Sequence, residues 1–220
     1  MQTHFEQGLA ELKTKLLTMA SHAEAAVTNA VKAVVERNDQ LAQKVDEDDA
    51  ILDQFEMEID EMAIQLLSKA PLASDLRLIA VAMKVSQNLE RVGDEATKIA
   101  RRAQDLSQEP QLKSYVDIPN MAKTALNMLK TALDSFVNRN PASAREVIPR
   151  DKEVDSLNKQ LHRELASFMV ENPNTITRCL NLMVISKSLE RIADHATNVA
   201  EEVVYLCEAR DIRHGGEETK

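Results

Sequence analysis

The sequence contains few of the residues that build β-structure and tight turns. Aromatic residues make up 3% of its 220 residues, and it contains no Trp, 4 Gly and 6 Pro. Strands are enriched in aromatic and β-branched residues, and sandwiches need many turns rich in Gly or Pro, so this composition argues against a β-sandwich or barrel. It favours long helices, because few helix-breaking residues interrupt the chain.

The chain also lacks the features of several functional classes. Its 2 cysteines, Cys179 and Cys207, fall in one expected helix, about 40 Å apart at 1.5 Å per residue, so they cannot form a disulfide with each other. No Gly-rich phosphate loop or Ser/His/Asp set is present, which argues against nucleotide hydrolysis and triad chemistry. No apolar run approaches the roughly 18 residues that cross a bilayer, and no signal segment is visible, so the expected compartment is the cytoplasm.

Negative charge is abundant. The chain has 36 Asp and Glu against 27 Lys and Arg, which gives a net charge of −9 and a pI of about 5.1. Nucleic-acid-binding proteins present basic surfaces, so no nucleic-acid partner is expected. A hydrophobic content of 44% and a charged content of 29% suit a soluble globular protein.

Apolar residues at helical spacing predict six helices. The expected helices span 4–37, 39–69, 74–107, 118–138, 141–171 and 175–212. Pro149 should kink or restart the fifth helix, because proline removes a backbone hydrogen bond. Ser74 and Thr175 are the expected N-terminal caps of the third and sixth helices.

A nine-residue stretch returns one hundred residues later in the chain. It reads LERVGDEAT at 89–97 and LERIADHAT at 189–197, and Asp53 likewise matches Asp155. Self-similarity of this kind indicates repeated structural units. The predicted fold is therefore all-α, with two tandem, pseudo-symmetric three-helix bundles at 1–109 and 118–214 and a mobile tail at 215–220.

Each half carries two pairs of acids spaced four residues apart, a spacing that places both carboxylates on one face of a helix. Such like charges cost roughly 0.2–0.5 kcal/mol per pair, so their repetition suggests a role. The helical wheel places them away from the apolar stripe, on the surface. We call Asp49, Asp53, Glu90 and Asp94 the first acid site, and Asp151, Asp155, Glu190 and Asp194 the second acid site.

Within each half the two pairs should meet, because each lies about 20 residues from the turn between two antiparallel helices. Four converging carboxylates form an oxygen-rich site for a hard cation such as Fe(III), Mn, Mg or Ca, and His195 near the second site allows Zn. The alternative is a solvated acidic face. Gly93 suggests a close neighbour to the helix backbone, and Lys98 is expected to pair with Asp94 and weaken the first acid site.

The duplicated acid motifs resemble those of the PhoU family, whose members regulate bacterial phosphate uptake. The resemblance extends over 5–216. Besides the acid pairs, it rests on Ser74-Asp75-Leu76-Arg77, on Leu89-Glu90-Arg91 with Gly93-Asp94, and on Asp211-Ile212-Arg213-His214-Gly215-Gly216.

The resemblance implies two three-helix PhoU repeats, multinuclear metal clusters (Fe, Zn, Mn or Mg) on the acid motifs of some members, and no enzymatic activity. It implies negative regulation of the phosphate (Pho) regulon, as an adaptor between the ATP-binding subunit of a phosphate ABC transporter and a phosphate-sensing histidine kinase. Through those partners the protein would associate peripherally with the membrane.

A homodimer is also expected, through an apolar face that includes Leu76, Ile79 and Met83. Rival interpretations of the same sequence are a metal-binding or metal-storage bundle, a carboxylate metalloenzyme, and a helical adaptor whose acids only face solvent.

Overall fold

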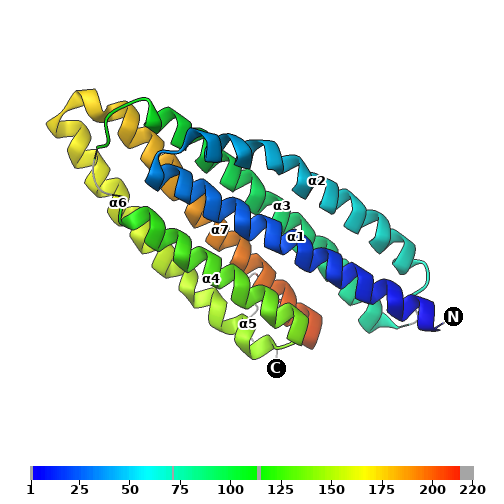
Figure 1. Ribbon diagram of the computed structural model, residues 1–220. Helices are drawn as coiled ribbons and strands as arrows, with labels where there is room; N and C mark the ends of the chain where they lie inside the picture. The colour runs from blue at the N-terminus through cyan, green and yellow to red at the C-terminus, as the bar shows by residue number, and fades with distance from the viewer. Residues whose placement is uncertain (1, 71, 113–114, 214–220) are drawn as a thin grey trace.

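The computed structural model describes residues 2–70, 72–112 and 115–213, and all regular structure within them is helical. The first half forms α1 (Gln2–Glu36), α2 (Asp39–Leu67) and α3 (Ala73–Ser107). These three helices pack on one another as the first three-helix unit. In Figure 1 the long helices run side by side, with α2 at one edge of the molecule and α5 and α6 at the other.

The second half repeats this arrangement with one bend. It comprises α4 (Asp117–Asn138), α5 (Pro141–Val147), the 3₁₀ turn η1 (Ile148–Arg150), α6 (Asp151–Glu171), the turn η2 (Pro173–Thr175) and α7 (Ile176–Glu208). Pro149 lies in η1, so the predicted kink is confirmed, and α5, η1 and α6 together take the place of α2. The six-helix, two-repeat plan is therefore confirmed.

Helix ends depart from the expectation in three places. Ser74 lies inside α3, and the N-cap position is Leu72, which makes no capping hydrogen bond. Thr175 is at the N-cap of α7, but its hydroxyl donates to the carbonyl oxygens of Phe168 (3.1 Å) and Asn172 (2.7 Å) instead of capping. The last helix ends at Glu208, before 212, because the next residue adopts the left-handed conformation. The tail at 215–220 lies outside the described residues.

The two units meet along α3 and α7, and also along α1 and α4. Lys84 of α3 donates to both carboxylate oxygens of Glu202 of α7 at 3.0 Å, and Arg191 of α7 lies 3.3 Å from Glu95 of α3. From the first pair to the second, the residue number rises along α3 and falls along α7, so the two helices are antiparallel at the centre of the molecule. Both central helices are consequently covered by neighbours on several sides.

The apolar face expected to form a dimer is only partly exposed. Ile79 is fully buried and belongs to the core, Met83 is half-buried, and Leu76 is exposed. The expected face is therefore wrong at Ile79, because α3 buries that side against the other helices of the molecule. None of the described helices combines the length and apolarity needed to span a membrane.

Candidate metal sites

The antiparallel packing of α2 on α3 brings the four carboxylates of the first acid site together. Burial raises the pKa of Asp49, and the nearby Asp94 and Asp53 carboxylates raise it further. Burial also raises the pKa of Glu90, to about 7, with contributions from Asp94, Glu56 and Asp53. Glu56, one turn along α2 from Asp53, is thus a fifth acid at this site.

The second acid site is assembled in the same way from α6 and α7. Burial raises the pKa of Asp194 to about 6, and the carboxylates of Glu190, Asp151 and Asp155 add to the effect. The pKa of Asp151 is raised by burial, then by Asp155 and Glu190. All eight predicted residues therefore fall into two clusters of four, one in each unit.

The acids are less exposed than the helical wheel predicted. Only Asp53 and Asp94 are exposed, and Glu190 is buried, with 8% of its surface accessible. The half-buried members are Asp49, Glu90, Asp151, Asp155 and Asp194. The expectation of outward-facing acids holds for Asp53 and Asp94 and is wrong for Glu190, because a neighbouring helix covers part of the polar side.

The chemistry of both sites fits a hard cation. The Thr97 hydroxyl lies beside Asp49 and lowers the pKa of that carboxyl. Thr97 Oγ1, Thr197 Oγ1 and Asp151 Oδ1 are buried oxygens without hydrogen-bond partners among the described residues. Unpartnered buried oxygens are costly unless something satisfies them, and Fe(III), Mn and Mg prefer oxygen donors. Over the described part of the chain, no three His, Cys, Asp or Glu already form a metal-holding group.

The two threonines did not emerge from sequence reasoning as site residues. They occupy matching positions, each three residues after the second acid of its α3 or α7 pair. A spacing of three places a side chain on the same helix face as that acid. The repeated stretch ending in Thr97 and Thr197 was the signal that could have identified them.

Gly93 allows α2 to approach α3 closely at the first acid site. A Cβ added to Gly93 would lie 2.2 Å from Leu52 Cδ1 and 3.6 Å from Asp49 Oδ1. The predicted close neighbour is therefore the Leu52 side chain. In the second unit the matching residues are Ala193 and Val154, both fully buried, so a larger residue on α7 faces a smaller one on α6.

The expectation for Lys98 is wrong. Lys98 Nζ donates to Glu95 Oε1 at 2.8 Å, and no ion pair with Asp94 is present among the described residues. Burial opposes ionisation of Glu95, but hydrogen bonds from Lys98 and Ser188 outweigh it and lower the pKa of that carboxyl. Lysines instead contact the second acid site, where Lys187 pairs with Glu190 and Lys159 lies 3.5 Å from Asp155.

A groove of about 450 Å³ lies where α3 and α7 cross. It is lined by Arg91, Asp94, Glu95, Lys98, Arg191, Asp194, His195 and Asn198. His195 Nδ1 is 3.0 Å from Asn88 Oδ1, and burial and Arg91 lower the pKa of the imidazole. His195 therefore belongs to the groove between units, and the groove joins the two acid sites through Asp94 and Asp194.

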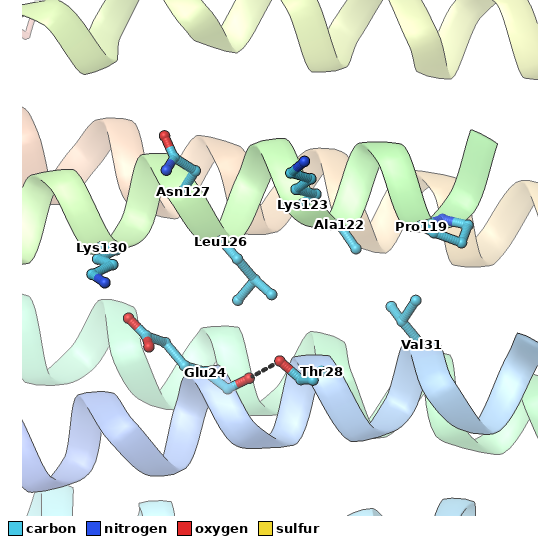
Figure 2. Close-up of a pocket in the computed structure, with 9 residues that line it drawn as sticks. All are labelled: Glu24, Thr28, Val31, Pro119, Ala122, Lys123, Leu126, Asn127 and Lys130. Atoms are coloured by element: carbon cyan, nitrogen blue, oxygen red, sulfur yellow. Dashed lines mark hydrogen bonds between the residues drawn. The ribbon is translucent and has the colours of Figure 1, made fainter. Parts of the chain in front are cut away.

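A second groove, of about 420 Å³, separates α1 from α4 (Figure 2). Val31 of α1 and Leu126 of α4 point into it, and Glu24 faces Lys130 across it. Burial raises the pKa of Glu24, while Lys130 acts in the opposite direction. With a single acidic residue in its lining, this groove does not offer the donor set of a cation site.

Known proteins are similar to this chain in both sequence and fold. The PhoU domain matches residues 16–103 and 118–203. A phosphate-specific transport system accessory protein PhoU homolog of Pseudomonas putida is 42% identical over 214 residues, which cover 96% of this chain and 84% of that protein. The homolog of Pseudomonas aeruginosa is 41% identical, with 96% and 88% covered.

Two crystal structures extend the comparison to the whole fold. PhoU from Pseudomonas aeruginosa has a TM-score of 0.90 and 40% identity, covering 94% of this chain and 100% of that one. The phosphate transport system regulatory protein PhoU from Streptococcus pneumoniae has a TM-score of 0.88 and 25% identity, covering 94% and 99%. The similarity thus includes both three-helix units and their arrangement.

Proposed function

This chain belongs to the PhoU family, and from that membership we propose that it is a negative regulator of phosphate uptake and of the phosphate (Pho) regulon. The observation that carries the proposal is similarity over 96% of the chain to a phosphate-specific transport system accessory protein, with the family domain matched in both halves. The family consists of accessory and regulatory proteins and not of enzymes. Its action should therefore come from contacts with other proteins.

The proposed partners are the ATP-binding subunit of a phosphate ABC transporter and a phosphate-sensing histidine kinase. The protein would act as an adaptor between them in the cytoplasm, would reach the membrane only through these partners, and would form a homodimer. The name of the relatives, which ties them to a phosphate transport system, supports the transporter contact.

Deletion of the gene tests this regulatory role. We expect phosphate-starvation genes to stay on in phosphate-rich medium, and the wild-type gene supplied in trans to restore repression. Normal repression in the deletion strain would contradict the proposal. Pull-down from cells with tagged protein should recover the transporter ATPase and the kinase, and recovery of neither would remove the adaptor role.

We also propose that the two acid sites bind hard cations, with Fe, Mn, Mg or Zn as candidates. The proposal is supported by the four half-buried to buried carboxylates of the second site, by the raised pKa of Glu90 and Asp194, and by the unpartnered oxygens of Thr97 and Asp151. A bound cation would supply positive charge that offsets repulsion among these acids. The chain's own contribution is to hold two acid pairs on neighbouring helices.

Metal analysis of protein purified without chelator tests the cation proposal. The double variant Glu190→Gln and Asp194→Asn keeps the shape of both side chains and should lower bound metal without unfolding the protein. The control Glu47→Gln and Asp48→Asn removes two exposed acids of α2 outside the sites. Equal metal content in both variants would mean that the second acid site only faces water. Normal repression by the first variant would separate metal at that site from signalling.

A further inference from the structure

The two acid sites differ in the lysines that contact them, and we infer that the first acid site binds a divalent cation more tightly than the second. Lys187 and Lys159 are the specificity-determining residues, because they already occupy carboxylates of the second site. The inference rests on the proposed cation binding and adds an order of affinity between the sites. It concerns this chain's lysines and not the acid motifs themselves.

At the second acid site, two carboxylates are already paired. Lys187 Nζ forms an ion pair with Glu190 Oε2, and only 11% of the Glu190 side chain is accessible. Lys159 Nζ lies 3.5 Å from Asp155 Oδ2, one helical turn away. A cation entering this site must displace an ammonium group from a nearly buried carboxylate and then remain beside that positive charge.

At the first acid site, no member of the four makes an ion pair with any described residue. Gln87 stands at the position of Lys187, and Met57 at the position of Lys159, so neither lysine has a counterpart. Arg91 lowers the pKa of Glu90 and Glu56 and so adds one positive charge beside the first site. Arg191, at the matching position, instead lies 3.3 Å from Glu95.

The first acid site also carries an additional acid. Glu56 is near enough to Glu90 to raise the pKa of that carboxyl. Its counterpart, Asn158, is neutral and accepts a hydrogen bond from Ser186 Oγ at 2.7 Å. Counted as formal charges, five acids and Arg91 give −4 at the first site, whereas four acids and two lysines give −2 at the second.

A separate observation points to a ligand at the first acid site. Thr97, with 4% of its surface exposed, has a hydroxyl beside Asp49 and no hydrogen-bond partner among the described residues. A buried, unpartnered donor oxygen among free carboxylates is the arrangement that a hard cation would complete.

Calorimetric titration of the chelator-treated, full-length protein with Mn²⁺ should resolve a tight and a weak class of sites. Glu90→Gln with Asp94→Asn should remove the tight class, whereas Glu190→Gln with Asp194→Asn should remove only the weak one. Lys187→Gln should tighten the weak class roughly tenfold, because a unit charge several ångströms from a divalent ion in partly solvated surroundings is worth about one factor of ten or more.

The matched control is Gln87→Lys, which places the lysine at the equivalent position of the first site and should weaken the tight class by a similar factor. The inference would be overturned if both acid sites bound Mn²⁺ with equal affinity. It would also be overturned if Lys187→Gln and Gln87→Lys left the Mn²⁺ affinities unchanged in proteins that remain helical by circular dichroism. Either result would leave cation binding in place. Absence of Mn²⁺ binding to any of these proteins would overturn both the inference and the cation proposal, and the regulatory proposal would still be tested separately by gene deletion.

Discussion

Replacement of Gly93 by Ala tests how the first unit brings its acid pairs together. The added Cβ would fall 2.2 Å from Leu52 Cδ1, far inside van der Waals contact, and 3.5 Å from Leu52 Cγ, an ordinary contact distance. Leu52 is 2% exposed, so it has little room to move away. Leu52→Val removes the clashing atom and reproduces the pairing of Ala193 with Val154 in the second unit.

Opposing contributions set the expected free energies of unfolding. Overpacking should destabilise Gly93→Ala by about 1–3 kcal/mol, and the better helix propensity of Ala should return about 1 kcal/mol, for a net loss near 1 kcal/mol. Leu52→Val alone should lose about 1 kcal/mol, because it leaves a small void beside Gly93. The double variant should have a free energy of unfolding close to that of the wild type. The coupling energy between the Gly93→Ala and Leu52→Val substitutions should therefore be about 1–3 kcal/mol in the stabilising direction.

Urea unfolding followed by circular dichroism, with chelator present, measures all four free energies. The reverse exchange in the second unit, Ala193→Gly with Val154→Leu, is the matched control and should also be coupled, because Leu should fill the space that Ala193→Gly opens. If the two substitutions in the first unit add within about 0.5 kcal/mol, the close approach of Leu52 to Gly93 is not the constraint that the structure indicates.

Other expectations follow from single groups. Because the pKa of Glu90 is raised, the folded protein loses stability progressively as the pH rises from 4.5 to about 7. Glu90→Gln removes this charge and, after allowance for solvent screening, should stabilise the metal-free protein by about 1 kcal/mol near pH 8. Near pH 4 the same variant should unfold like the wild type, and an equal gain at both pH values would refute the assignment. Glu202 is 5% exposed and accepts hydrogen bonds from Lys84 and Arg213 at 3.0 Å. Glu202→Gln should therefore lower the free energy of unfolding, measured with urea, by about 1–2 kcal/mol, whereas the control Glu47→Gln should leave it unchanged. Light scattering at micromolar concentration should give about twice the 24.6 kDa chain mass, and the monomer mass alone would count against the homodimer.

The helical plan was predictable because it depends on local chemistry. Apolar spacing and the positions of proline fixed the number and order of helices, and Pro149 marked the bend between α5 and α6. Helix ends were less predictable, since Ser74 has the chemistry of a cap but lies within α3. Spacing along one helix also placed the acid pairs at matching heights, which the packing of α2 on α3 and of α6 on α7 reproduces.

The surroundings of the acids could not be obtained from one helix at a time. A helical wheel separates apolar from polar faces but does not show where a neighbouring helix covers the polar side, so the burial of Glu190 was missed. Lys98 can reach either Glu95 or Asp94 along its own helix. Glu95 is favoured because it is buried and also faces Arg191 of the other unit, a contact that exists only in the assembled fold.

The antiparallel crossing of α3 and α7 gives the two acid sites a shared border. Asp94 and Asp194 line the same groove, one from each site, together with Arg91 and Arg191. Neutralising the acids of one site therefore changes the charge that lines the groove bordered by both sites. If the first acid site fills before the second, the charge of the groove would change in two steps as the cation concentration rises.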